Sequence, residues 1–84
     1  GRFLVAYVAL GQEHFSEAVA AAGEALALRR QYPEARLVRA EALARQGRLE
    51  EARRDLEQFL AEAPPELSAE RARAEAFLRR PASR

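Results

Sequence analysis

The sequence of 84 residues contains no cysteine, tryptophan or methionine. Without cysteine, the chain can form neither a disulfide framework nor a metal site built on thiolates. It has one histidine, His14, which rules out a site with two histidine ligands in one chain. A domain of this length buries only about 60 to 65% of its unfolded surface. Its stability must therefore come from close packing of a thin core.

The sequence also lacks an excess of charge of either sign. Fourteen arginines, and no lysine, stand against 13 acidic residues, for a net charge of +1. The paired arginines Arg53 and Arg54 lie next to Glu50, Glu51 and Asp55, which predicts a solvated, charge-balanced helix face. We therefore expect no binding of nucleic acid. Arginine as the only basic residue, with no Asn, Thr or Ile, favours a bacterial source with GC-rich codons.

Long hydrophobic runs are missing too. The longest nearly uninterrupted run, Phe3–Leu10, has eight residues, whereas a helix needs about 20 to cross a bilayer. It has neither a basic leader nor a cleavage site, so it is not a complete signal peptide. We expect no membrane insertion. Without a targeting signal the sequence does not reveal the compartment, and a cytoplasmic location is only weakly favoured.

No set of residues suggests catalysis. His14 is expected in a solvated turn, and Ser16 lacks the glycine-rich elbow of a nucleophile. Glu50 and Glu51 are adjacent and point in different directions on a helix. The glycines form neither of the common phosphate-binding patterns. We expect no enzyme activity, catalytic residue, cofactor or metal site.

An internal repeat with a period of about 34 residues is the most informative feature that is present. The segment Arg39–Ala42, with the sequence RAEA, recurs as Arg73–Ala76. The same offset relates other pairs, such as Glu17 and Glu51. A four-residue identity in phase with such pairs is hard to obtain by chance, so the period predicts a repeat architecture.

Proline and glycine divide the repeat into two helices. The first begins at Pro33 and ends at Gly47, because glycine readily adopts the left-handed conformation that ends helices. The second begins near Leu49 and ends before Pro64 and Pro65, which cannot continue a helix. The pattern predicts a helical hairpin with a short turn.

The flanking segments follow the same pattern. The preceding unit has one helix from about Arg2 to Gly11 and a second from about Ser16 to Arg29, and a last helix runs from about Ser68 to Arg80. Serine is a favoured N-cap residue, so we expect Ser16 and Ser68 to cap their helices.

Two helices in each period, with small residues where they cross, resemble the tetratricopeptide repeat (TPR) family. In the best-matching unit, Ala40 and Ala52 stand at the family's small positions, Leu43 at a large one and Pro64 at the closing proline. The family's early tryptophan is absent. The resemblance implies an all-α, TPR-like solenoid of helical hairpins with five antiparallel helices.

The resemblance also implies a division of the chain as one domain, residues 1–84. Residues 1–32 are the first repeat, expected to be truncated at its start, and residues 33–66 are the second. Residues 67–80 form a capping helix, and residues 81–84 are expected to be a disordered tail.

Stacked TPR hairpins form a curved solenoid whose first helices line a concave, protein-binding face. The resemblance therefore implies that the partner is a protein or peptide. The residues expected on that face are Phe3, Tyr7, Leu10, Leu37, Glu41, Arg45, Arg71 and Glu75. Phe3 and Leu37 could equally be packed core residues in so short an array.

The first predicted helix has no polar face, whereas a terminal helix of a solenoid should be polar outside. We expect an upstream repeat or a second copy of the chain to cover it, which makes a homo-oligomer possible. Two other interpretations stay open beside that of an interaction module. In the first, the chain is a self-associating or spacer segment. In the second, it is an accessory domain of a larger enzyme or regulator.

Overall fold

A computed structural model describes residues 1–80 of the chain. The predicted disordered tail, residues 81–84, lies outside the described part. The helices are α1 (Arg2–Gly11), α2 (Phe15–Leu28), α3 (Pro33–Arg45), α4 (Leu49–Glu62) and α5 (Ser68–Leu78). The described residues contain no strand. The all-α, five-helix prediction is confirmed.

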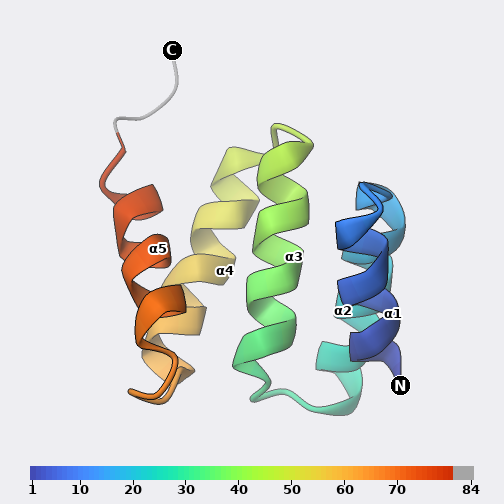
Figure 1. Ribbon diagram of the computed structural model, residues 1–84, viewed down its shortest axis with the longest axis horizontal. Coiled ribbons are helices and arrows are strands. Elements are labelled where there is room, and N and C mark those ends of the chain that lie inside the picture. Colours follow the sequence, from blue (N-terminus) through green and yellow to red (C-terminus); the bar gives the residue numbers. More distant parts are fainter. Residues whose placement is uncertain (81–84) are drawn as a thin grey trace.

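The helices form a curved row in which each one packs against its neighbours along the chain (Figure 1). The hairpin of α1 and α2 lies at one end of the row, and α5 lies at the other. Besides these sequential contacts, α1 also packs against α3. No helix among residues 1–80 is long and apolar enough to span a membrane.

Both hairpin turns use the same left-handed residue position. Gly47 follows α3 with φ 79°, and Glu13, at the equivalent position of the preceding repeat, has φ 63°. In each turn the next amide donates to a carbonyl five residues back, His14 N to Ala9 O at 2.9 Å and Arg48 N to Leu43 O at 2.9 Å. The predicted left-handed conformation of Gly47 is confirmed, and α3 itself ends two residues earlier, at Arg45. The two turns share their backbone conformation as well as their place in the repeat.

The two predicted serine caps are wrong. Ser16 and Ser68 lie inside the first turns of α2 and α5, and neither helix has a side-chain cap hydrogen bond. The left-handed turn places His14 at the N-cap of α2, earlier in the chain than the serine pattern suggested. Ser16 Oγ instead accepts a hydrogen bond from Gln46 Nε2 at 3.1 Å, which links the two hairpin turns.

The core consists mainly of alanines at the helix crossings. Ala6, Ala18, Ala40 and Ala52 are all at most 1% exposed. Phe59 of α4 is the largest fully buried side chain among the described residues, and it forms the centre of the cluster that joins α3, α4 and α5. Because alanine is small, helix axes can approach closely, and the larger side chains fill the space beside the crossings.

The left-handed turn gives a first prediction. Replacing Gly47 by alanine should lower the free energy of unfolding by about 1 kcal/mol, because a Cβ is strained at positive φ. Urea unfolding followed by circular dichroism measures the change. Gly11→Ala is the matched control, since Gly11 ends α1 without positive φ and with open space around it. That substitution should leave the stability unchanged or raise it, and an equal loss in both variants would contradict the assignment.

Candidate binding surfaces

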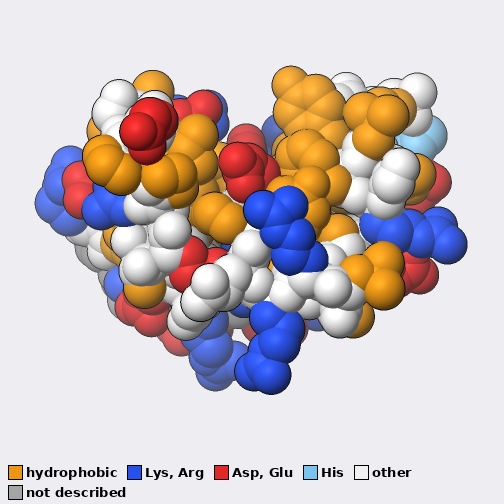
Figure 2. Space-filling view, turned by 90° about the horizontal axis from the view of Figure 1, so that it is seen from below, with side chains coloured by type: hydrophobic (Ala, Val, Ile, Leu, Met, Phe, Trp, Pro, Cys, Tyr) orange, Lys and Arg blue, Asp and Glu red, His pale blue; other side chains and the backbone are white. Residues whose placement is uncertain are grey.

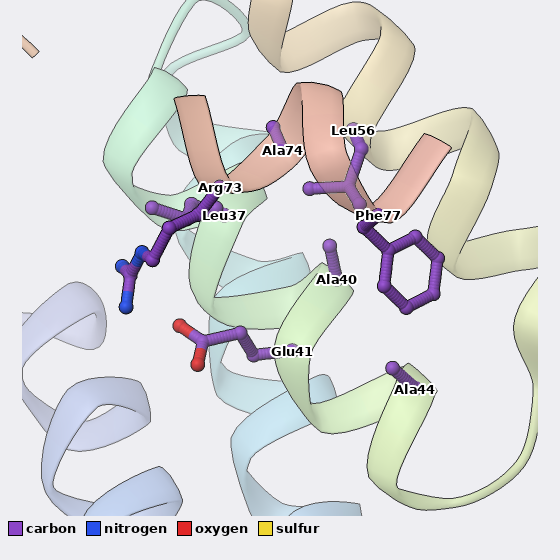
Figure 3. A pocket seen from close by; sticks show the side chains of 8 residues that line it. All are labelled: Leu37, Ala40, Glu41, Ala44, Leu56, Arg73, Ala74 and Phe77. Atoms are coloured by element: carbon purple, nitrogen blue, oxygen red, sulfur yellow. The ribbon is translucent and has the colours of Figure 1, made fainter. Parts of the chain in front are cut away.

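The last helix departs from the spacing of the repeat. The helices α1 and α3 approach each other closely, but no Cα atom of α5 lies within 8 Å of a Cα atom of α3. The wider spacing leaves a pocket of about 160 Å³ between α3 and α5, with α4 behind it (Figure 3). Its lining residues are Leu37, Ala40, Glu41, Ala44, Leu56, Arg73, Ala74 and Phe77.

The pocket has an apolar interior and a charged rim. Ala40 and Ala74 face each other from α3 and α5, and both are almost fully buried. Figure 3 shows Glu41 and Arg73 on one side of the pocket, with their charged ends turned toward the same region of solvent. Phe77 lies on the opposite side. The pocket therefore presents apolar contact area next to one acidic and one basic group.

An aromatic cluster forms the other end of the same face. The ring of Phe3 lies 6.1 Å from that of Tyr7 and 5.3 Å from that of Tyr32, measured between centroids. The guanidinium of Arg29 lies 4.2 Å from the centroid of the Tyr32 ring, at cation–π distance. Figure 2 shows a hollow between the α1 and α5 ends, with hydrophobic side chains on both sides and an acidic side chain between them.

Several of the residues predicted to bind a partner lie on these two surfaces. Leu37 and Glu41 line the pocket, while Phe3 and Tyr7 belong to the aromatic cluster. Phe3 and Leu37 are each half-buried and pack against core clusters, and a role of either residue in partner binding stays a prediction. Tyr7 is 61% exposed and is free to contact another molecule. Glu75 is exposed on α5 but does not line the pocket.

Leu10 and Arg45 make internal contacts. Leu10 is half-buried and packs against the core clusters beneath α1. The guanidinium of Arg45 lies 4.8 Å from the ring centroid of Phe15 and 3.4 Å from a carboxylate oxygen of Glu13. Both contacts hold the turn between α1 and α2 against α3. A role of Leu10 and Arg45 in partner binding stays a prediction.

Two arginines fasten the ends of α5 to α4. Arg71 Nη1 donates to the carbonyl oxygens of Leu60 at 3.0 Å and Ala63 at 2.9 Å. These carbonyls lie at the C-terminal end of α4, where no later helical amide is available to donate a hydrogen bond to them. At the other end of α5, Arg53 Nη2 donates to the carbonyl oxygen of Leu78 at 3.2 Å. In this structure Arg71 positions the pocket wall, and a direct contact with a partner stays a prediction.

Sequence reasoning selected only Leu37 and Glu41 among the eight residues that line the pocket, and it missed the other six. Arg73, Ala74 and Phe77 of α5 line it together with Ala44, and none of them was selected. The repeat offers one signal, because Phe77 stands one full period after the buried Leu43. The pocket also requires a larger distance between α5 and α3 than between α3 and α1. The repeat pattern does not predict that difference in helix spacing.

A buried charge cluster joins α3 and α4, where the sequence predicted a solvated face. Asp55 is only 5% exposed. It accepts two hydrogen bonds of 2.8 Å from Arg39 and one of 3.4 Å from Arg36. The hydrogen bond with Asp55 raises the pKa of the Arg39 guanidinium, against the opposing effect of burial. The prediction of a solvent-exposed position is wrong for Asp55, which lies on the buried side of α4 together with Ala52 and Phe59.

Glu62 extends the charge cluster toward the end of α4. Its Oε1 atom lies 3.7 Å from Arg36 Nε, which is too long for a hydrogen bond, and both atoms are buried without a hydrogen-bond partner. Arg36 also donates to the carbonyl oxygen of Arg30 at 3.3 Å, so the cluster reaches the loop between α2 and α3. Among residues 1–80, no group of His, Cys, Asp and Glu side chains is arranged to hold a metal ion.

Comparison with known protein families gives a match to the tetratricopeptide repeat over residues 9–80, which is most of the chain. Comparisons with curated proteins and with solved structures give no match.

The charge cluster gives a second prediction. Asp55→Asn keeps the volume of the side chain but leaves two arginines facing a neutral amide, so it should destabilise the fold by about 3 kcal/mol. Chemical unfolding measures the loss. Glu57→Gln is the matched control on the same helix, because Glu57 is exposed, and it should change the stability by less than about 0.5 kcal/mol. Equal stability of the two variants would show that Asp55 does not support the contact between α3 and α4.

Proposed function

Because the chain belongs to the tetratricopeptide repeat family, we propose that it binds an extended segment of a partner protein on the concave face formed by α1, α3 and α5. Tetratricopeptide repeats generally mediate protein–protein interactions and are typically not catalytic. The pocket between α3 and α5 is the observation that carries the proposal. It is an apolar opening between α3 and α5, the first helices of two successive repeats.

The size of the pocket suits one side chain. Its volume of about 160 Å³ is below the roughly 300–1,000 Å³ of typical small-molecule sites. Protein interfaces often depend on a few apolar side chains that enter well-packed pockets. A partner segment with one leucine-sized or phenylalanine-sized residue can bury that residue between Ala40, Ala44 and Ala74.

The groups beside the pocket fit an extended segment. Glu41 can accept hydrogen bonds from backbone amides or pair with a basic residue of the partner, and Arg73 can donate to carbonyls or to an acidic residue. The ring of Tyr7 and the cluster with Phe3 offer a second apolar contact at the α1 end. A segment that crosses α3 from α5 to α1 would use both surfaces.

A pocket-filling substitution tests this function. Random linear peptides displayed on phage are selected on the immobilised chain, and the enriched sequences are synthesised with a fluorescent label for anisotropy titrations. We expect the enriched peptides to share one apolar residue. Ala44→Leu should weaken their binding at least about tenfold, equivalent to about 1.4 kcal/mol, because the added side chain occupies the pocket.

Ala20→Leu is the control for this experiment. Ala20 is an exposed residue of α2 outside the pocket, so the substitution makes the same chemical change elsewhere on the surface. Its peptide affinities should equal those of the unmodified chain. The concave-face proposal would be contradicted if no peptide is enriched, or if the Ala44→Leu variant binds the peptides as tightly as the unmodified chain. Either result would favour a spacer or self-associating segment.

A further inference from the structure

The outer side of α1 is an apolar surface that no other residue among residues 1–80 covers. Leu4, Val5 and Val8 are 60%, 40% and 47% exposed, and they line an open groove together with Glu17 of α2. We call Leu4, Val5, Val8 and Glu17 the apolar end face. This face lies on the hairpin of α1 and α2, at one end of the row (Figure 1), and shares no residue with the pocket between α3 and α5.

The repeat shows what kind of surface covers such a face. In the next repeat, the positions of Leu4 and Val8 are taken by Val38 and Ala42 of α3, and both are buried, at 5% and 0% exposure. There α2 covers α3 with small side chains. Ala21 and Ala22 pack with Val38, and Ala18 packs with Ala42. By continuity with this internal interface, the apolar end face fits a helix that carries small residues.

The opposite end of the molecule carries a helix of that kind. Ala69, Ala72 and Ala76 of α5 are all exposed. Their spacing of three and four residues places them on one side of the helix, opposite the buried Ala74. We call Ala69, Ala72 and Ala76 the alanine end face. The small side chains would let a neighbouring helix approach closely.

Charge distinguishes the two end faces. Glu17 lies in the groove of the apolar end face. Arg73, Arg79 and Arg80 are exposed within four residues of Ala72 or Ala76, and Glu75 is exposed there as well, which leaves an excess of positive charge beside the alanine end face. Contact between two apolar end faces would bring Glu17 residues together, and contact between two alanine end faces would bring arginines together. Contact between unlike end faces places Glu17 against the face that carries an excess of arginines, which is electrostatically favourable.

We propose that copies of this chain associate head to tail, with the alanine end face of one copy covering the apolar end face of the next. Such a contact is heterologous, so each added copy leaves one end face of each kind free and growth continues unless a ring closes. The concave pocket is on neither end face. Successive copies would therefore present successive pockets, and a partner with repeated binding segments would bind them with increased avidity.

Complementary variants test this arrangement in sedimentation-velocity experiments over a wide range of concentrations. The unmodified chain should show an average mass that rises with concentration and passes that of a dimer. Val8→Glu blocks the apolar end face, and Ala72→Glu blocks the alanine end face, so each variant alone should be monomeric. An equimolar mixture of the two variants should form a heterodimer and grow no further, because one unblocked face of each kind remains.

The controls separate this contact from other causes. Leu28→Glu replaces an 82% exposed leucine at the end of α2, outside both end faces, and should leave the association unchanged. Circular dichroism should show equal helix content in all variants, and added salt should weaken the association because the flanking charges are exposed. A monomeric unmodified chain at every concentration would overturn the proposal. So would a dimer that Ala72→Glu does not affect, since it would pair two α1 helices, or a variant mixture that stays monomeric.

Discussion

The close approach of helices at alanine crossings is the constraint on which the structure depends. Ala6 and Ala18 in the first hairpin, and Ala40 and Ala52 at the equivalent positions of the second, are almost fully buried. A larger residue at any of them would force two helix axes apart, and the shift would pass to every later helix in the row. Alanine contributes little apolar area in return. The larger buried residues, above all Phe59, and the polar contacts between helices must supply the rest.

The two hairpins meet this requirement in different ways. In the second, Arg39 and Arg36 pair with Asp55 at the contact of α3 and α4. The positions equivalent to Arg39 and Asp55 in the preceding repeat hold Val5 and Ala21, so the first hairpin is apolar where the second is charged. A buried ion pair adds little net stability, but either partner alone is costly. The cluster therefore favours one arrangement of α3 on α4 and penalises any shift that would separate the charges.

The repeat period predicted the helices, their order and the family, because the buried small residues and the turn at Gly47 recur in register. It failed where identical sequence meets different neighbours. The two RAEA segments are the clearest case. Ala42 is fully buried beneath α2, while the matching Ala76 is exposed. Arg39 is paired with Asp55, while the matching Arg73 stands at the rim of the pocket. Identical sequence predicts the same helix, but it does not predict which residues pack against that helix. The repeat pattern therefore could not show which residues of α5 line the pocket.

The position of α5 explains why the pocket exists where it does. The helix α3 has close backbone contacts on both sides, with α2 and α4, whereas α5 has them with α4 alone among the described helices. Ala74 and Phe77 of α5 pack into the cluster around Phe59, which also includes Ala40 of α3, at a wider helix spacing than the repeat would give. The hydrogen bonds from Arg71 and Arg53 then fix its two ends on α4. The width of the pocket is therefore set by polar contacts at the ends of α5 and by apolar contacts at its middle. The charged rim residues Glu41 and Arg73 take no part in these contacts.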